Sequence, residues 1–551
     1  MKIALVQLNY IVGDLEGNSS RIREKVLQAA ENNVDLVIFS ELSICGYPPL
    51  DLLERASFVE SCIERIHSLA EHLPPEIGVI IGGPEFNEHE EGKLLFNSAY
   101  FLNNGKIVKT FRKALLPTYD IFDEYRYFEP NRVFETLHFK GKSIALTICE
   151  DMWDDQPVEN KFARSRLYTR HPLEELMADH PDFVINIAAS PFSAKRQQVK
   201  EEIFTQKARK HKLPVFMVNQ VGANTELIFE GGSMVVAADG EVIHQLDLFR
   251  EDYFEVSLED CYKKQGKDKI LPHQRIGMIA DALIMGVKDY FEKSGFTKAT
   301  LGLSGGIDSA VTLAVAAEAL GPENLHVLLL PSQYSSDHSI SDSETMAKNL
   351  GVGYTIIPIH EIFNLYRKAM DPLFHDLKED ITEENIQSRI RGTLLMALSN
   401  KMGHILLNTS NKSETAVGYG TLYGDMAGGL SVLGDVYKID VYALAEYFNR
   451  ESEIIPVNSI TKAPSAELKP DQKDADSLPE YELLDQVLEL YIEKQCSLEQ
   501  IIHEGFDESL VRKIIRMVNM NEYKRYQTPP ILRISSKAFG VGRRIPIVGR
   551  Y

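Results

Sequence analysis

A short glycine loop in the second half of the chain has residue types that suit phosphate chemistry. It follows the apolar run 299–303 and precedes a helical pattern over 308–320. Its residues are Ser304, Gly305, Gly306, Ile307, Asp308 and Ser309. Helix N-termini attract anions, two glycines let a phosphate approach the backbone, and Ser304 and Ser309 add hydroxyl donors. Asp308 would repel a phosphate, so we expect it to hold a Mg²⁺ ion that bridges the two.

This loop therefore predicts a nucleotide–metal site, and the alternative is an ordinary strand-to-helix turn with an N-capping aspartate. A polar turn after the apolar run 406–408 supplies further candidates. Thr409 lies at a strand end, Glu414 can complete the Mg²⁺ shell, and Lys438 can neutralise charge on a phosphate. Taken singly, Glu414 and Lys438 fit a solvated charge or a helix cap better.

Three residues of the first half of the chain suit amide hydrolysis. Glu41, Lys113 and Cys149 each follow an apolar strand pattern, so all three can converge in one cleft. A cysteine thiolate can attack an amide carbon, a carboxylate can take and return the proton, and a lysine can stabilise the oxyanion. The set predicts hydrolysis through a thioester. The alternative for each residue alone is an inert core cysteine or a solvated charge.

Two α/β domains must position these residues. In the first, short apolar β-branched runs are separated by helical patterns. The predicted strands are 2–8, 35–39, 77–82, 96–101, 143–148, 183–187, 215–219 and 233–238, and the predicted helices are 18–32, 52–72 and 196–212. The polar stretch 251–272 lacks such a pattern and is predicted to be a linker between domains at 1–250 and 273–551.

Strands alternate with helices in the second domain, which predicts a doubly wound parallel sheet with its ligand at the carboxyl ends of the strands. The predicted order is helix 275–294, strand 299–303, helix 308–320, strand 325–330, helix 337–350 and strand 354–358. The proline-rich stretch 464–480 is interpreted as a mobile active-site loop. Helices are predicted at 481–495 and 508–520, and the basic tail 523–551 is expected to be irregular.

Composition narrows the class of protein. The 551 residues are 44% apolar and 25% charged, as in globular proteins, and the formal charge of −21 opposes nucleic-acid or anionic-membrane binding. The five cysteines are scattered without C-x-x-C pairs, so neither a disulfide framework nor a zinc site is expected. No apolar run approaches a membrane span, and the first residues do not resemble a signal peptide. We expect a cytoplasmic protein.

The glycine loop resembles the N-type ATP pyrophosphatase family, which splits ATP into AMP and pyrophosphate. The glycine loop is not a Walker loop, because it lacks the Gly-Lys-Ser ending of that motif. The Gly-Lys-Ser at 141–143 does not form one either, because Thr136 stands where the first glycine should be. Residues 275–551 resemble the NAD synthetase family. The resemblance includes 385–392, which looks like that family's helix facing the dinucleotide, and the ordering loop 463–468. It implies that Asn385, Arg389, Glu414 and Lys438 bind deamido-NAD. Residues 423–429 are less acidic than the same stretch in relatives that use free ammonia, so the roles of 426–429 stay open. In this stretch the chain resembles the glutamine-using branch of the family.

The strings around Glu41, Lys113 and Cys149 resemble the nitrilase/amidase superfamily. These strings are SELSICGYPP at 40–49, RKALLP at 112–117 and ICEDMW at 148–153. The resemblance implies an α-β-β-α sandwich, with Tyr119 and Glu124 as oxyanion-side aromatic and supporting carboxylate. It implies that Tyr119, Ser190 and Arg196 hold glutamine, with Arg196 on its α-carboxylate. Tyr47 and Glu150 are weaker candidates, for which packing or capping is the alternative.

Together the resemblances imply an ATP-dependent ligase that amidates deamido-NAD with ammonia from L-glutamine. ATP and Mg²⁺ are expected at a Rossmann-like, adenine nucleotide alpha hydrolase-like domain, without a prosthetic group. A homo-oligomer and an internal ammonia tunnel are further expectations. One alternative is another N-type amidotransferase, which makes asparagine or a nucleobase amide. The other is a nucleotide-sensing protein on an inactive nitrilase fold.

Overall fold

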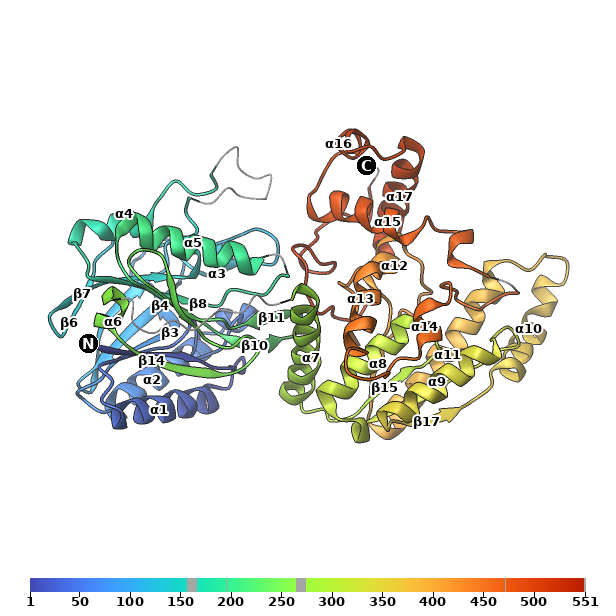
Figure 1. Ribbon diagram of the computed structural model, residues 1–551, viewed down its shortest axis with the longest axis horizontal. Helices are drawn as coiled ribbons and strands as arrows, with labels where there is room; N and C mark the ends of the chain where they lie inside the picture. The colour runs from blue at the N-terminus through green and yellow to red at the C-terminus, as the bar shows by residue number, and fades with distance from the viewer. Residues whose placement is uncertain (156–165, 195, 264–273, 471, 550–551) are drawn as a thin grey trace. The chain divides into compact units, whose positions relative to one another are not determined.

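Two six-stranded sheets organise the first part of the chain in the computed structural model, which describes residues 1–155, 166–194, 196–263, 274–470 and 472–549. The chain divides into two units, Met1–Pro272 and His273–Tyr551 (Figure 1). The first sheet has the order β14-β1-β2-β3-β4-β5 and the second β13-β12-β9-β8-β7-β6. The strands of the two sheets are β1 (Lys2–Gln7), β2 (Leu36–Ile38), β3 (Gly78–Phe86), β4 (Leu95–Asn103), β5 (Lys106–Arg112), β6 (Leu137–Phe139), β7 (Lys142–Ile148), β8 (Phe183–Ala188), β9 (Val215–Asn219), β12 (Met234–Val236), β13 (Val242–Gln245) and β14 (Asp252–Ser257).

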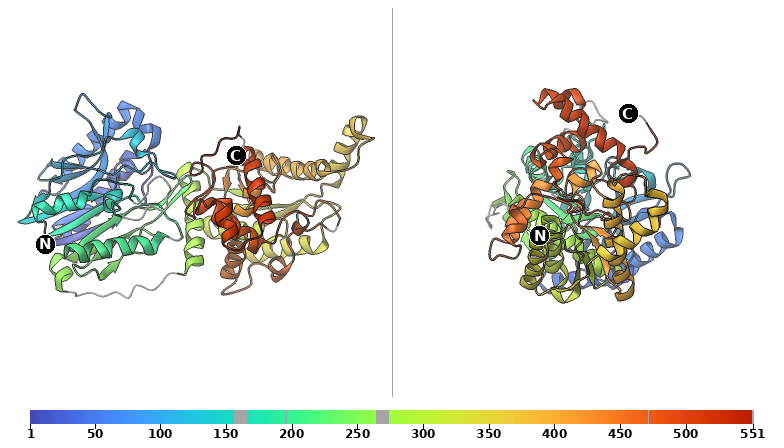
Figure 2. Two further views of the ribbon diagram at one scale, coloured as in Figure 1. Left: turned by 90° about the horizontal axis from the view of Figure 1, so that it is seen from above. Right: turned by 90° about the vertical axis from the view of Figure 1, so that its right-hand side faces the viewer.

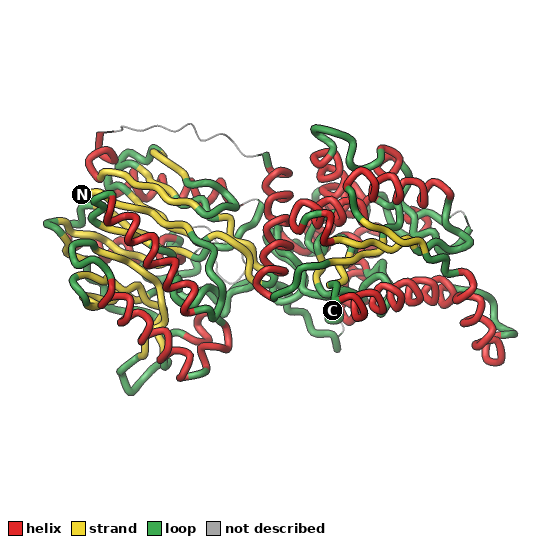
Figure 3. Tube along the Cα trace, turned by 90° about the horizontal axis from the view of Figure 1, so that it is seen from below, coloured by secondary structure: helices red, strands yellow, loops and turns green. Residues whose placement is uncertain are grey.

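Alternation along β1 explains the layers of this unit. Ile3 and Leu5 point into a core shared with Ile185 of the second sheet. Ala4 and Val6 point the other way, into a core shared with two covering helices. The helices of the unit are α1 (Leu15–Glu31), α2 (Ala56–His72), α3 (Glu124–Tyr127), α4 (Pro172–Leu176), α5 (Arg196–His211) and α6 (Leu258–Lys263). Helices α1 and α2 cover the first sheet, and α4 and α5 cover the second (Figures 1 and 3). The predicted α-β-β-α sandwich is confirmed.

The predicted linker is wrong over part of its length. Residues 252–257 form β14, which pairs antiparallel with β1 from Lys2–Ser257 to Gln7–Asp252. An edge strand tolerates charged residues on its open side, so its sequence lacks the apolar run of an inner strand. Helix α6 follows directly and places Leu258 and Cys261 in the sandwich core. The rest of the predicted linker, 264–272, lies outside the described residues. The short hairpin β10 (Val221–Asn224) with β11 (Leu227–Glu230) also has no counterpart among the predicted strands.

The second unit is built on a five-stranded parallel sheet of order β17-β16-β15-β18-β19. The strands are β15 (Ala299–Gly302), β16 (Leu325–Leu329), β17 (Gly353–Ile356), β18 (Ile405–Asn408) and β19 (Leu430–Ser431). The chain leaves β15 toward β16 on one side and returns to β18 on the other, so the order reverses at β15. The predicted doubly wound, Rossmann-like sheet is confirmed, and its ligand site is expected at this reversal.

Helices cover both faces of this sheet. They are α7 (Arg275–Ser294), α8 (Ile307–Leu320), α9 (Asp337–Leu350), α10 (His360–Phe374), α11 (Ile381–Met402), α12 (Lys412–Val417), α13 (Lys438–Phe448), α14 (Val457–Thr461), α15 (Tyr481–Leu488), α16 (Leu498–His503), α17 (Glu508–Met520) and α18 (Glu522–Arg525). Helices α10 and α11 form a hairpin that extends from the sheet, gold in Figure 2. The predicted helix 481–495 is α15 followed by a π-helical turn over Glu489–Glu493. No helix among the described residues is both long enough and apolar enough to cross a bilayer.

Candidate active sites

Cys149 occupies a strained turn at the end of β7 in the first unit. Its backbone φ of +45° lies in the left-handed region, which is uncommon for residues other than glycine. The next residues form a 3₁₀ turn over Cys149–Met152, so the strand stops abruptly at the cysteine. Asn186 of β8 donates to the Cys149 carbonyl at 3.4 Å. The position of Cys149 at an abrupt strand end fits a reactive cysteine whose backbone is held in place.

Lys113 joins two carboxylates in the same unit. Its Nζ lies 2.7 Å from Oε1 of Glu41 and 2.9 Å from Oε1 of Glu124, and all three side chains are buried. Burial alone would lower the pKa of Lys113, but the charges of Glu124 and Glu41 outweigh it and raise that pKa well above its ordinary value. Lys113 therefore stays an ammonium group that can stabilise negative charge.

Burial also dominates the titration of the neighbouring acids. It raises the pKa of the Cys149 thiol well above its ordinary value, with Glu41 adding to the effect and Lys113 opposing it. The thiol is therefore neutral at rest and needs a base. Burial likewise raises the pKa of Glu124 to about 7, although Lys113 lowers it. Tyr47 donates to Glu124 at 2.9 Å, which assigns this weaker candidate a contact with the supporting carboxylate.

Two polar side chains that sequence reasoning missed hold this arrangement together. The Asn97 side chain, on β4, donates from Nδ2 to Glu41 at 2.7 Å, and the backbone carbonyl of Asn97 accepts from the backbone N–H of Lys113. The buried carboxylate of Asp151 accepts from the backbone N–H groups of Ala114, Leu115 and Ile148 at 2.9–3.1 Å. Asp151 thus fastens the segment after Lys113 to the residue before Cys149. The string that contains Cys149 includes Asp151, but its contacts depend on the tertiary fold.

The residues predicted to hold glutamine are described in part. Tyr119 donates to Oε1 of Glu150 at 2.8 Å, and Tyr168, absent from the predicted set, donates to the same atom at 2.9 Å. Ser190 follows β8 and is fixed through its backbone by Asn219, whereas the preceding Ala189 donates its N–H to Glu41. Arg196 begins α5, but its side chain lies outside what the structure describes.

The glycine loop of the second unit connects β15 to α8. Gly305 has a φ of +78°, and a Cβ atom there would lie 2.4 Å from the Ser339 carbonyl, so no other residue fits. The hydroxyls of Ser304 and Ser309 lie 3.2 Å apart, and Ser304 Oγ accepts from the N–H of Gly306. The helix N-terminus and the two hydroxyls border the pocket that we describe below.

Asp308, Glu414 and Lys438 converge beside this loop. Lys438 Nζ lies 2.5 Å from Oδ2 of Asp308 and 3.4 Å from Oε1 of Glu414. Asn411, which sequence reasoning missed, caps α12 and donates to Oδ1 of Asp308 at 2.8 Å. Burial first, and then the charge of Asp308, raise the pKa of Glu414 to about 8, although Lys438 opposes them.

This group fits a Mg²⁺ ion bound partly by substrate. The carboxylates of Asp308 and Glu414 already share one cation, the Lys438 ammonium. Among the described residues, no cluster of three or more His, Cys, Asp or Glu side chains forms a complete metal site. Mg²⁺ is usually held by one or two carboxylates, with phosphate oxygens and water completing its shell. The two carboxylates therefore suit a metal that arrives with a phosphate ligand.

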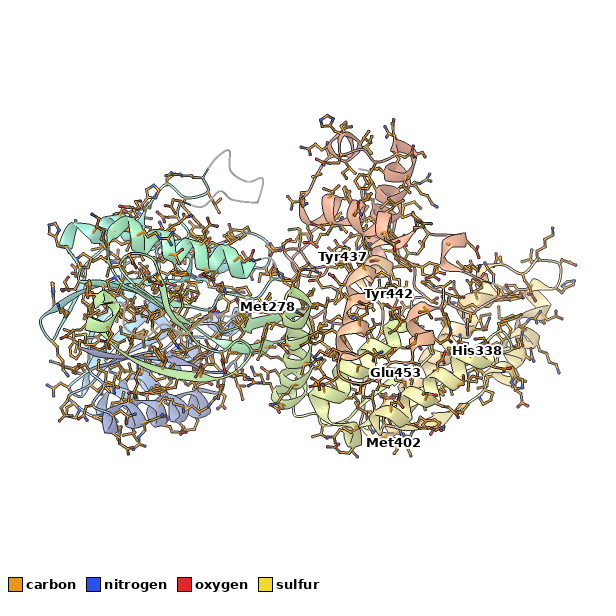
Figure 4. All side chains as sticks on the ribbon, viewed as in Figure 1. Met278, His338, Met402, Tyr437, Tyr442 and Glu453 are labelled. Carbon is orange, nitrogen blue, oxygen red and sulfur yellow. The ribbon has the colours of Figure 1, made fainter. Side chains whose placement is uncertain are left out.

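A pocket of about 280 Å³ opens at these strand ends. It is bordered by the glycine loop, by Thr409 and Glu414, and by Tyr442, which is labelled in Figure 4. The loop 463–468 also borders the pocket, and Glu467 accepts from Ser339 Oγ at 2.7 Å and from Lys462. The mobility predicted for 464–480 stays a prediction.

Asn385 and Arg389 do not line this pocket. Both side chains reach the neighbouring loop: Asn385 accepts from Thr421 at 2.7 Å, and Nε of Arg389 donates to the Leu422 carbonyl at 3.2 Å. Their proposed contact with a dinucleotide therefore concerns a surface beside the pocket. A different side of α11 faces the pocket itself, with Ser388, Arg391 and Leu395.

Comparisons with known proteins cover the whole chain. Residues 2–263 match the carbon-nitrogen hydrolase family, and residues 279–528 match the NAD synthase family. A glutamine-dependent NAD(+) synthetase of Synechocystis sp. is 46% identical over 550 residues, covering 99% of this chain and 98% of that protein. One from Thermotoga maritima is 39% identical over 586 residues, covering 100% and 99%. The solved structure of glutamine-dependent NAD+ synthetase from Acinetobacter baumannii in complex with adenosine diphosphate is 37% identical, covering 99% and 98%, with a TM-score of 0.78. The predicted resemblances to the nitrilase/amidase superfamily and to the NAD synthetase family are confirmed.

Proposed function

The chain belongs to the glutamine-dependent NAD(+) synthetase family, and from that premise we propose how its two sites divide the reaction. The protein is a ligase that amidates deamido-NAD to NAD, with glutamine as the amide donor. The observation that carries this reading is the presence in one chain of two chemical sites: the buried Glu41–Lys113–Cys149 group and the Asp308–Glu414–Lys438 group beside a glycine loop. The alternatives of another amidotransferase or a non-catalytic sensor find no support in relatives that match over the full length.

The first unit hydrolyses glutamine in this proposal. Glu41 takes the proton of the Cys149 thiol, and the sulfur attacks the side-chain amide carbon. Lys113, an ammonium group 2.7 Å from Glu41, stabilises the oxyanion. Ammonia leaves with a proton returned by Glu41, and water then releases glutamate from the thioester. Tyr119, Ser190 and Arg196 bind the rest of the glutamine molecule, and Glu124 holds Lys113 in place.

The second unit activates the nicotinate carboxylate with ATP. A carboxylate oxygen attacks the α-phosphorus, the α–β phosphate bond breaks, and pyrophosphate leaves on the loop of Ser304, Gly305, Gly306 and Ser309. Ammonia then attacks the acyl carbon and displaces AMP. Mg²⁺, held by Asp308 and Glu414, neutralises charge on the phosphates when bound, and Lys438 adds a fixed positive charge. Thr409 contacts ATP. Asn385, Arg389, Glu414 and Lys438 contact deamido-NAD.

The same proposal includes a path for ammonia, an oligomeric state and a cellular location. Ammonia passes between the two sites through an internal tunnel, the chain forms a homo-oligomer, and the protein works in the cytoplasm. Free ammonia becomes protonated in water at neutral pH, which favours a protected path. Isotopically labelled glutamine, supplied with excess unlabelled ammonium, tests the tunnel, because a protected path keeps the label in NAD.

Product stoichiometry tests the proposed function. The purified protein is incubated with deamido-NAD, ATP, Mg²⁺ and glutamine, and all products are quantified together. The proposal predicts equal amounts of NAD, AMP and pyrophosphate, with at least as much glutamate. Aspartate in place of deamido-NAD serves as the control acceptor. Formation of ADP and phosphate, or pyrophosphate release that follows aspartate instead of deamido-NAD, contradicts the proposal.

A further inference from the structure

One face of α11 lines the nucleotide pocket with a regular stripe of residues. Ser388, Arg391, Gly392 and Leu395 are spaced at i, i+3, i+4 and i+7, so they share one side of the helix. Leu395 lies against β15, because a Cβ atom on Gly302 would meet it at 3.3 Å. Arg391 lies one turn before Leu395, on the same side. Arg391 is therefore the one cationic residue of this stripe, and it lies at the wall of the pocket.

Among the described residues no ion pair holds the Arg391 guanidinium, although the charges of Asp425 and Glu467 act to raise its pKa. Among the described residues the structure gives it one hydrogen bond, from Nε to the Leu330 carbonyl at 2.9 Å, and no ion pair. Two fully buried lysines of this unit differ: Lys412 pairs with Asp435 at 2.9 Å, and Lys438 pairs with Asp308. Burial lowers the pKa of Arg391 to about 10, so the group stays charged at neutral pH. A partly buried cation whose Nη donors the described residues leave available can bind a ligand at the pocket wall.

The position of Arg391 selects one end of the nucleotide. Its Nε–H is fixed to Leu330, directly after β16, whereas Asp308, Asn411 and Glu414 gather between β15 and β18. Because the sheet order is β16-β15-β18, the guanidinium and the metal candidates lie on opposite sides of β15. A triphosphate that rests on the glycine loop with its metal toward β18 directs its nucleoside toward β16. The pocket lining there is apolar, formed by Leu328, Leu329, Leu330, Pro331 and Leu395.

We propose that Arg391 is a binding residue for the nucleoside part of ATP, with its guanidinium plane against the adenine ring. An arginine plane stacks well on an aromatic face, and the leucine surroundings suit a base better than phosphates. The Leu330 carbonyl holds the plane in position before the nucleotide binds. This inference rests on the proposed function in one respect only, that the pocket takes ATP.

Direct ligand binding tests the role of Arg391. Calorimetry measures the affinities of ATP, AMP and pyrophosphate, each with Mg²⁺, for the full-length protein and for Arg391→Met and Arg391→Lys. Lysine keeps the charge but not the planar group. Loss of the stacked plane should weaken ATP and AMP by about tenfold in both variants, with pyrophosphate unchanged. Lys401→Met, an exposed cation on the same helix, is the matched control and should bind all three ligands as wild type does.

Two results overturn the inference. Unchanged ATP affinity in Arg391→Met shows that the residue does not bind the nucleotide. Restored affinity in Arg391→Lys, or an equal loss of pyrophosphate binding, shows that it binds phosphate through charge alone. The glutaminase rate of each variant verifies that the chain has folded. Wild-type protein that binds ATP but leaves deamido-NAD unchanged contradicts the proposed function while leaving the assignment of Arg391 intact.

Discussion

Lys438 holds Asp308 through a contact of 2.5 Å between Nζ and Oδ2, across 130 residues of sequence. Asn411 donates to the other oxygen of the same carboxylate, so both oxygens of Asp308 are fixed in advance of any ligand. The carboxylate of Asp308, in the first turn of α8, is thus directed toward the N-termini of α12 and α13. In the proposed reaction, such preorganisation limits the rearrangement needed when Mg²⁺ and ATP bind.

Replacing Asp308 should abolish the synthetase reaction and spare the glutaminase. Asp308→Asn keeps the size of the side chain but removes one of the two carboxylates for Mg²⁺. We expect a loss of roughly 10²-fold or more in NAD formation from either glutamine or ammonium. Rates of NAD and glutamate formation are measured separately. Glu318→Gln, an exposed carboxylate on the same helix α8, should retain both rates. NAD formation near the wild-type rate in Asp308→Asn would remove this residue from the metal site.

Glu414 should make the nucleotide-free protein less stable as the pH rises. Its pKa is raised to about 8 in the folded state, above its ordinary value of 4.5. The folded state therefore binds more protons than the unfolded state between these values, so the free energy of unfolding falls with rising pH over that window. Glu414→Gln lacks this cost, so its free energy of unfolding should gain on that of wild type by about 1.4 kcal/mol per pH unit across the window.

Melting temperatures of both proteins from pH 5 to 8.5, without metal or nucleotide, measure this difference. The gap should widen in favour of Glu414→Gln as the pH rises. Glu446→Gln, an exposed carboxylate on α13, should track wild type at every pH. A gap that does not change with pH would contradict the raised pKa.

Asp151 should matter for the shape of the glutaminase site as well as for stability. Asp151→Ala leaves the buried N–H groups of Ala114, Leu115 and Ile148 without this acceptor. Each such group costs about 1–3 kcal/mol, so a loss of several kcal/mol in the first unit is expected. Asp151→Asn keeps one carbonyl acceptor, so its stability should lie between those of wild type and Asp151→Ala. Chemical denaturation and the glutaminase kcat are the measurements, with Asp179→Ala as an exposed control. Equal stability of wild type and Asp151→Ala would refute the role of these contacts.

Much of this architecture is predictable because inner strands bury both faces. The apolar runs that become β1, β7 and β8 stand out for that reason, and the ends of β7 and β8 lead to the candidates Cys149 and Ser190. Strand β14 is not recognisable in the same way, because one edge of it is open and its sequence includes Asp252 and Glu255.

The unpredicted parts of the sites depend on contacts between distant segments. Asn97 and Asp151 act on Glu41, Lys113 and Cys149 only after the strands have paired. On α11 the sequence indicates a helix with two arginines, but its packing against β15 decides that Arg391 faces the pocket and Arg389 the loop. Sequence spacing shows which residues share one face of a helix. Which face lines the pocket depends on how the helix packs in the fold.

Separation of the two nitrogen sources tests the central claim of two cooperating sites. Cys149→Ala and the control Cys261→Ala, a buried cysteine of the same unit, are each supplied with deamido-NAD, ATP and Mg²⁺. NAD is then measured with glutamine and, separately, with added ammonium. Cys149→Ala should lose NAD formation from glutamine and keep it from ammonium, while Cys261→Ala keeps both. Loss of both activities in Cys149→Ala, in protein that melts as wild type does, would contradict the account.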